Sequence, residues 1–85
     1  MKAVLLRGTD GVEVLHIGEH PDPVMKEDEL LVRVKATALN RADLLQRRGK
    51  HPPPKGVPHI LGLEMAGEVV DVGAACEGWA PGDRV

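Results

Sequence analysis

Residues 29–49 read ELLVRVKATALNRADLLQRRG, and the change of periodicity inside this stretch decides the fold. In residues 30–38 apolar and polar side chains alternate, which predicts a β-strand with one face buried and the other in water. The apolar face holds Leu30, Val32, Val34, Ala36 and Ala38, and the polar face holds Arg33, Lys35 and Thr37. The alternation stops at Asn40, and residues 41–48 predict a short helix.

The two ends of this helix carry their own signals. Asn40 is a favoured N-cap residue, because its side-chain oxygen can accept from the free amides of the first turn. Asp43 stands where the acid of a capping box stands, and its charge suits the positive end of a helix. Arg47 and Arg48 suit the negative end, and Gly49 is a natural helix stop.

Outward from this stretch, the chain predicts further strands separated by Gly and Pro. Residues 2–7 and 12–17 predict a pair of strands, joined by a tight turn at residues 9–11 in which Asp-Gly tolerates positive φ. The prolines at residues 52–54 favour an extended loop. Residues 65–72 predict another strand.

Two features of the last third of the chain add to this arrangement. Gly67 lies inside the strand predicted at residues 65–72, and it indicates a close backbone approach or a bulge. Residues 79–85 predict a turn that enters a further strand. Because a natural domain seldom ends inside an element without a partner, we expect the chain to be part of a longer protein.

The composition excludes several classes of function. The chain has one Trp and no Tyr or Phe, so stacking of nucleic-acid bases on aromatic side chains is not expected. A formal net charge of −2 offers no field that would draw DNA or an anionic membrane. No apolar stretch approaches the ~20 residues of a membrane span. We therefore expect neither nucleic acid nor membrane as a partner.

The reactive side chains give little direct sign of catalysis. Cys76 is the single cysteine, so no internal disulfide forms, and a cytoplasmic location is expected. A lone cysteine is usually a small apolar residue, although a Cys–His nucleophile is not excluded by counting. The four His residues show no metal-ligand spacing. Glycine-rich nucleotide loops and a G-x-S-x-G elbow are absent from the sequence.

A set of ordered motifs carries a resemblance over nearly the whole chain. The motifs are ALNRAD at residues 38–43, Gly49, ILGLEMAGEV at residues 60–69, VG at residues 72–73 and GDRV at residues 82–85. Together they resemble the N-terminal domain of medium-chain dehydrogenases, most of all the quinone oxidoreductases related to zeta-crystallin. The resemblance implies a mainly β fold, a partly open GroES-like barrel with one short helix, and residues 1–85 as a truncated form of that domain.

The same resemblance implies a cofactor and a chemistry. NADPH would be bound mainly by a downstream Rossmann domain that this chain lacks, and hydride would pass to a quinone or an activated enone. Zinc-dependent members carry a Cys ligand where this chain has Asn40, and Gly-His-Glu where it has Gly62, Leu63 and Glu64. An amide and an isobutyl group cannot replace a thiolate and an imidazole as ligands. No zinc is therefore expected.

The resemblance also implies roles for individual residues. Asn40 would face the nicotinamide end of the cofactor, in addition to capping the helix. Leu45 and His51 would line the substrate pocket, at points where relatives often carry a tyrosine; the alternative for His51 is a place in a solvated loop. Asp43 and Glu64 are expected to have structural or supporting roles. No residue of the chain is predicted to be catalytic.

Two rival functions remain open at this stage. The chain could be a non-catalytic GroES-like module for binding or assembly, which would need no downstream glycine loop. It could also belong to an enoyl reductase of the same superfamily that acts on thioesters. In the leading interpretation the partner is a small-molecule quinone or enone, the complete protein is compatible with a homodimer, and the 85 residues alone are inactive.

Overall fold

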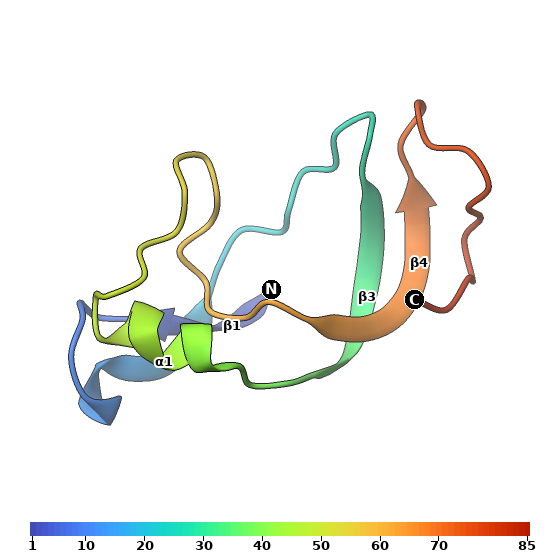
Figure 1. The fold of residues 1–85 in the computed structure, drawn as a ribbon. Coiled ribbons are helices and arrows are strands. Elements are labelled where there is room, and N and C mark those ends of the chain that lie inside the picture. Colours follow the sequence, from blue (N-terminus) through green and yellow to red (C-terminus); the bar gives the residue numbers. More distant parts are fainter. The chain divides into compact units, whose positions relative to one another are not determined.

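The computed structural model describes residues 1–85, which form two compact units. Unit 1 comprises Met1–Pro21 and Leu39–Leu63, and unit 2 comprises Asp22–Ala38 and Glu64–Val85. Figure 1 shows the elements, which in chain order are β1 (Lys2–Leu6), the 3₁₀ turn η1 (Val12–Val14), β2 (Leu15–Glu19), β3 (Leu30–Thr37), α1 (Arg41–Arg47) and β4 (Met65–Val72). The prediction of a mainly β fold with one short helix is confirmed.

In unit 1, β1 and β2 pair antiparallel, with Val4 opposite Ile17. The strand predicted at residues 12–17 is wrong at its start, because Val12–Val14 form η1 and β2 begins only at Leu15. The residues of η1 alternate in polarity as a strand does. Periodicity alone therefore could not separate this single turn from the strand that follows it.

The loop before η1 also differs from the prediction. Gly11 has a φ of −77°, so the Asp-Gly pair does not form a tight hairpin turn, and the positive φ of this loop falls on Gly8, at +106°. The ladder continues past β1 through the N–H of Arg7, which donates to the carbonyl oxygen of Val14 at 2.9 Å. The connection is consequently wider than a two-residue turn.

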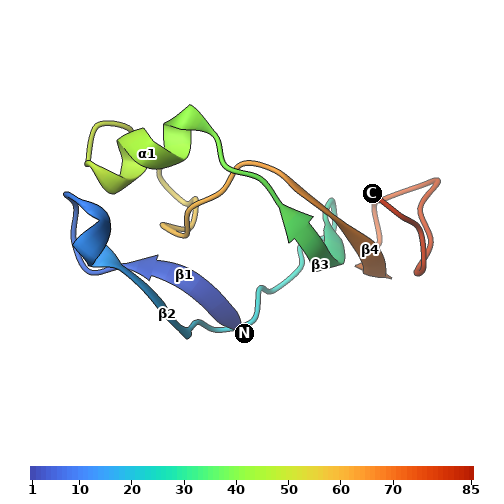
Figure 2. The same cartoon turned by 90° about the horizontal axis from the view of Figure 1, so that it is seen from below.

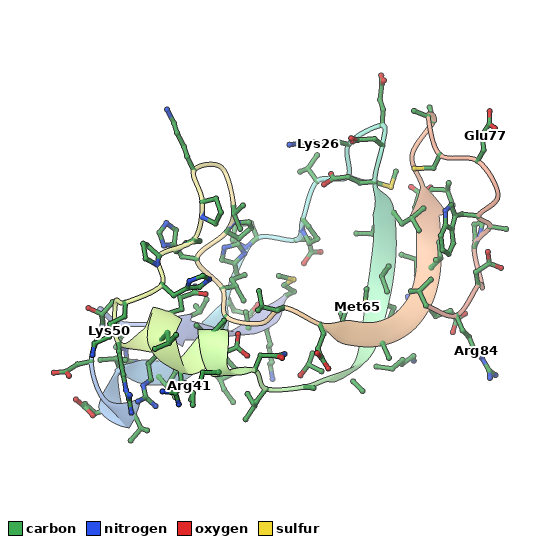
Figure 3. All side chains as sticks on the ribbon, in the orientation of Figure 1. Lys26, Arg41, Lys50, Met65, Glu77 and Arg84 are labelled. Carbon is green, nitrogen blue, oxygen red and sulfur yellow. The ribbon has the colours of Figure 1, made fainter.

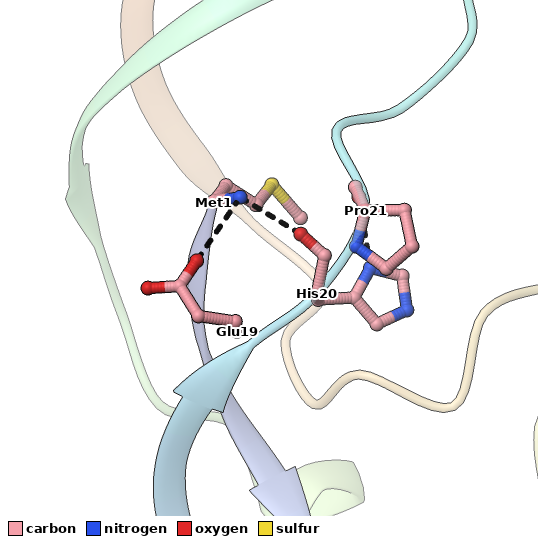
Figure 4. A network of polar contacts seen from close by, with 4 residues as sticks. All are labelled: Met1, Glu19, His20 and Pro21. Carbon is pink, nitrogen blue, oxygen red and sulfur yellow. Dashed lines mark hydrogen bonds and ion pairs between the residues drawn. The ribbon is translucent and has the colours of Figure 1, made fainter.

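The other end of the hairpin is closed by a small polar network (Figure 4). The N–H of His20 donates to the Met1 carbonyl oxygen at 2.9 Å, and the Met1 ammonium donates to the His20 carbonyl oxygen at 2.8 Å. The same ammonium lies 3.6 Å from Glu19 Oε2, and His20 Nδ1 lies 3.0 Å from the Pro21 carbonyl oxygen. These contacts extend the β1–β2 ladder by one residue pair.

The helix of unit 1 ends at Arg47, one residue before its predicted end, and Gly49 is the helix stop that was predicted. Gly49 has a φ of +76°, and its N–H donates to the Gln46 carbonyl oxygen at 3.0 Å. The N–H of Lys50 donates to the Leu45 carbonyl oxygen at 2.8 Å. These two bonds make a Schellman motif, which satisfies carbonyl groups that the last turn leaves free. In the views of Figures 1 and 2, α1 lies over the β1–β2 hairpin.

In unit 2, β3 and β4 pair antiparallel, and β4 has the bounds predicted for it. The ladder is irregular between Val34 and Ala36, where one residue of β3 bulges. A Cβ atom on Gly67 would lie 2.3 Å from the carbonyl oxygen of Arg33, closer than real Cβ contacts allow. The close backbone approach predicted at Gly67 is confirmed.

The segment at residues 82–85 lies along the other edge of β4. The N–H of Gly67 donates to the Val85 carbonyl oxygen at 2.9 Å, and the N–H of Val85 donates back at 3.0 Å. The N–H of Val69 donates to the Asp83 carbonyl oxygen at 2.8 Å. The turn predicted within residues 79–85 is present at Pro81 and Gly82, but the strand predicted after it is an isolated bridge between Arg84 and Glu68 of β4.

Very few side chains are fully buried. Val69, 1% exposed, is the single buried apolar residue, and Asp43, 4% exposed, is the single buried charged residue. The apolar face predicted in residues 30–38 is not covered as expected, since Val34 is 53% exposed. Alternation specifies which side chains share a face, whereas burial also requires a second layer over that face.

Candidate functional site

Four of the five predicted site residues lie in unit 1, on α1 or next to it. Asn40 immediately precedes the helix, Asp43 and Leu45 lie on it, and His51 follows it. Glu64 belongs to unit 2 and immediately precedes β4. The candidate site is therefore built on α1 and its flanks.

Asn40 and Asp43 close the N-terminal end of α1. Asn40 has an extended backbone, and the two residues have the arrangement of a capping box. The N–H of Asn40 donates to Asp43 Oδ2 at 2.9 Å, and the N–H of Asp43 donates to the Asn40 carbonyl oxygen at 3.0 Å. These two bonds fix the backbone from which the Asn40 side chain projects.

Leu45 and His51 differ in their surroundings. Leu45 is half-buried on α1, and its carbonyl oxygen is used by the Schellman motif. His51 is exposed and lies at the start of the loop that contains the prolines at residues 52–54. Both residues lie in the same unit as Asn40. Leu45 precedes the C-terminal end of α1 and His51 follows it.

Glu64 and its neighbour Leu63 are both exposed. The Leu63 side chain is 65% exposed. Glu64 is the first residue of the second stretch of unit 2 and takes part in a polar interaction. Nowhere in the chain do three His, Cys, Asp or Glu side chains gather as metal ligands would. The donor set at the positions of Asn40 and Leu63 is one amide and one hydrocarbon, which does not suit zinc.

Two contacts that the sequence did not predict hold α1 in unit 1. Gln46 Nε2 donates to the His59 carbonyl oxygen at 3.1 Å, which ties the loop after α1 back to the helix. Arg47 Nε donates to the Asp10 carbonyl oxygen at 3.1 Å, and the N–H of Asp10 donates to the Arg47 carbonyl oxygen at 2.9 Å. Side-chain bonds to distant backbone carbonyl groups leave no pattern in a sequence, so no signal could have found them.

Two buried polar atoms of unit 1 also went unpredicted. Asp43 Oδ1 and His16 Nδ1 are both buried, and neither has a hydrogen-bond partner within the protein. Buried polar atoms nearly always have a partner, because their desolvation is costly. The sequence predicted that Asp43 lies in the first turn of the helix, but it did not indicate that the carboxylate is buried.

No helix of the chain combines the length and the hydropathy that a membrane-spanning helix needs. The longest helix is α1, which has 7 residues.

Residues 26–85 match the family described as alcohol dehydrogenase GroES-like domain. Among individual proteins, the chain is similar to the acryloyl-coenzyme A reductase of Metallosphaera sedula, with 41% identity over 86 residues that cover 100% of this chain and 25% of that protein. The chain spans between 20% and 25% of the length of the first curated relatives that it matches.

Two solved structures have the same fold as this chain. One is an NAD-dependent alcohol dehydrogenase, with a TM-score of 0.87 and 43% identity over 99% of this chain and 24% of that chain. The other is the quinone oxidoreductase of Escherichia coli in complex with NADPH, with a TM-score of 0.86 and 33% identity over 99% of this chain and 26% of that chain. All three of these similar proteins are oxidoreductases by name.

Proposed function

Because this chain belongs to the alcohol dehydrogenase GroES-like domain family, we propose that it is the N-terminal, substrate-side domain of an NADPH-dependent oxidoreductase of the medium-chain type. Hydride passes from NADPH, which becomes NADP⁺, to an acceptor that is already electrophilic, either a quinone or an activated enone, and a proton from water completes the reduced product. The similarity to a quinone oxidoreductase that binds NADPH supports this acceptor class and this cofactor. The phosphates of NADPH are held mainly by the part of the protein that follows this chain.

The observation that carries the choice of acceptor is the pair Asn40 and Leu63. The resemblance places zinc ligands of the zinc-dependent members at these two positions. In the zinc-dependent members a Lewis acid polarises the oxygen of an alcohol or a ketone, and neither side chain supplies a suitable zinc ligand. A quinone or an enone accepts hydride without such a metal ion, so this pair favours these acceptors over alcohols.

In the proposed mechanism the chain binds and orients the reactants. NADPH, when bound, supplies the hydride. Asn40 presents its amide to the nicotinamide end of the cofactor, and Asp43 holds the Asn40 backbone through the bond of 2.9 Å. Leu45 and His51 lie on the acceptor side of α1. Since none of these residues is an obvious general acid, positioning of the two reactants is the main contribution of this domain.

The similarity to an acryloyl-coenzyme A reductase supports a second acceptor, an enoyl thioester. An enoyl thioester is an activated enone in the chemical sense, because its carbonyl group withdraws electrons from the double bond. Hydride transfer to it would use the same cofactor and the same positions of Asn40, Leu45 and His51. The two acceptors therefore differ in the group attached to the carbonyl rather than in the reaction.

The test is steady-state kinetics and metal analysis of the complete protein. We expect NADPH oxidation that depends on a quinone or an enone. We also expect no catalytic zinc ion bound stoichiometrically through the position of Asn40. Oxidation of a simple alcohol that requires a tightly held zinc ion would overturn the proposal. Absence of turnover with every acceptor, in a folded complete protein, would favour the binding or assembly module instead.

A further inference from the structure

The second stretch of unit 1, residues 39–63, holds an excess of positive charge. It contains five basic residues and one acid, a formal net charge of +4, in a chain whose total is −2. The basic residues are Arg41, Arg47, Arg48, Lys50 and Lys55. The acid is Asp43, which is buried, and its Oδ2 accepts from the N–H of Asn40. The positive charge is therefore not neutralised within the stretch.

Arg48 and Lys50 are the two exposed members of this group that lie at the C-terminal end of α1, whereas Arg41, which is also exposed, lies at its N-terminal end. Both side chains are exposed, and neither forms an ion pair or a side-chain hydrogen bond within the chain. Their backbone is held by α1, since the N–H of Arg48 donates to the Leu44 carbonyl oxygen at 3.2 Å and the N–H of Lys50 belongs to the Schellman motif. Figure 3 shows Lys50 beside this end of α1.

The negative end of the helix dipole does not account for this much charge. A helix terminus carries about half an elementary charge, and one nearby cation offsets it. Arg47 already supplies that cation, since it lies in the last turn and is half-buried, with its Nε bonded to the Asp10 carbonyl oxygen at 3.1 Å. Arg48 and Lys50 are therefore left as two positive charges that can bind an anion.

We propose that Arg48 and Lys50 bind the phosphate groups of a coenzyme A thioester, which makes an enoyl thioester the acceptor of the hydride. This inference rests on the proposed function, because it uses the place given there to Asn40. A quinone or a simple enone has no anionic group for the pair to bind. A coenzyme A thioester carries a diphosphate and a phosphate monoester, both ligands that guanidinium and ammonium groups favour.

The length of α1 fits this substrate. Asn40 stands before the first turn and Arg48 after the last, and a helix of 7 residues is about 10 Å long at ~1.5 Å per residue. The pantetheine arm of coenzyme A, when extended, is longer than such a helix. The pantetheine arm can therefore lie along α1. The thioester would then be at the N-terminal end of the helix, near Asn40, and the phosphates at its C-terminal end, near Lys50.

The experiment compares two thioesters in the complete protein. One is crotonyl-coenzyme A, and the other is the crotonyl thioester of N-acetylcysteamine, which has the same reacting group without phosphates. We expect the wild-type protein to have a KM about tenfold lower for the coenzyme A form, an advantage that shrinks as salt is added. The variant Arg48→Gln/Lys50→Gln should lose most of this advantage.

The matched control is Lys2→Gln/Arg7→Gln, which removes one Lys and one Arg charge from exposed positions of the same unit. It should keep the wild-type difference between the two thioesters. Glutamine is a good helix former, and circular dichroism checks that each variant is folded.

Three outcomes would overturn the inference. Equal KM values for the two thioesters in the wild-type protein would remove it while leaving the proposed function intact, because hydride transfer would still be observed. A rise in the KM of NADPH that exceeds the rise for crotonyl-coenzyme A would assign the pair to phosphates of the cofactor. Absence of hydride transfer to any acceptor would end the proposed function together with the inference.

Discussion

The bond between Asn40 and Asp43 determines how the role of Asn40 can be tested. An Asp at position 40 would cap a helix as well as Asn does. Here, however, it would bring a second carboxylate next to buried Asp43, whose Oδ2 lies 2.9 Å from the backbone nitrogen of residue 40. Like charges at such separations destabilise each other, so a loss of activity in that variant would have two causes. Serine is the better replacement, because it caps without charge.

We predict that Asn40→Ser in the complete protein preserves stability and lowers activity. Ser caps as well as Asn, so the free energy of unfolding should change by less than ~0.5 kcal/mol. Loss of the amide at the nicotinamide should lower kcat and kcat/KM together by at least about tenfold, or ~1.4 kcal/mol. Thermal unfolding and steady-state kinetics measure both quantities.

Asn40→Ala is the matched control for this prediction. It removes the cap as well as the amide, and it should therefore cost an additional ~1 kcal/mol of stability. Wild-type kinetics in Asn40→Ser would leave Asn40 with capping as its whole role.

Gly49 is the residue at which the end of α1 can be tested. A side chain there must adopt a φ of +76°, which costs about 1–2 kcal/mol, and its Cβ would lie 3.1 Å from Thr9 Oγ1. We predict that Gly49→Ala lowers the free energy of unfolding of the complete protein by about 2 kcal/mol. Gly56→Ala separates the two causes, since Gly56 has a φ of +85° and open space around it. An equal loss in both variants would show that the Thr9 contact contributes nothing.

At the scale of elements, the β3–β4 pair depends on the absence of a side chain at Gly67. A Cβ there would press against the backbone of Arg33, which cannot rotate away as a side chain can. We predict that Gly67→Ala destabilises the complete protein by at least about 1–3 kcal/mol, the usual cost of overpacking. Chemical denaturation gives the value.

Ala66→Val is the control on the same strand. Ala66 is exposed, and a surface change away from special features usually alters stability by less than ~0.5 kcal/mol. An unchanged free energy of unfolding in Gly67→Ala would mean that β3 and β4 can move apart far enough to make room for the added Cβ atom.

Local signals explain which elements could be predicted from the sequence. β4 has its predicted bounds, and α1 ends within one residue of its prediction, because Gly49 and the Asn40–Asp43 pair mark the helix ends chemically. The 3₁₀ turn η1 was missed, since its residues alternate like those of a strand. Features that depend on contacts between distant parts of the chain left no local signal in the sequence. The burial of Asp43 and the hydrogen bond from Gln46 to His59 are two examples.

At the scale of the whole molecule, the shortage of buried apolar side chains decides how the chain behaves alone. Val69 is the single fully buried one, and such a side chain contributes about 1.5–3 kcal/mol. Ordering the backbone costs about 1–2 kcal/mol for every residue, so the half-buried side chains must offset a far larger sum. The balance does not favour a stable fold for these residues by themselves.

We therefore predict that residues 1–85, produced alone, unfold without cooperativity and oxidise no NADPH with any quinone or enone. Scanning calorimetry and an absorbance assay test the two parts of this prediction. A cooperative domain of this size would show an unfolding enthalpy of about 60 kcal/mol, at ~0.7 kcal/mol per residue. A transition of that size, or acceptor-dependent turnover by the isolated chain, would contradict it.

The long connection between β3 and β4 has a consequence during synthesis on the ribosome. Val72, the last residue of β4, follows Thr37, the last residue of β3, by 35 positions. At about 5–20 residues per second, β3 waits roughly two to seven seconds for its partner. An unpaired strand edge recruits other nascent chains, and charged side chains along it discourage that pairing. Arg33 and Lys35 place two exposed positive charges on β3, and like charges on neighbouring nascent chains repel each other while this strand lacks its partner.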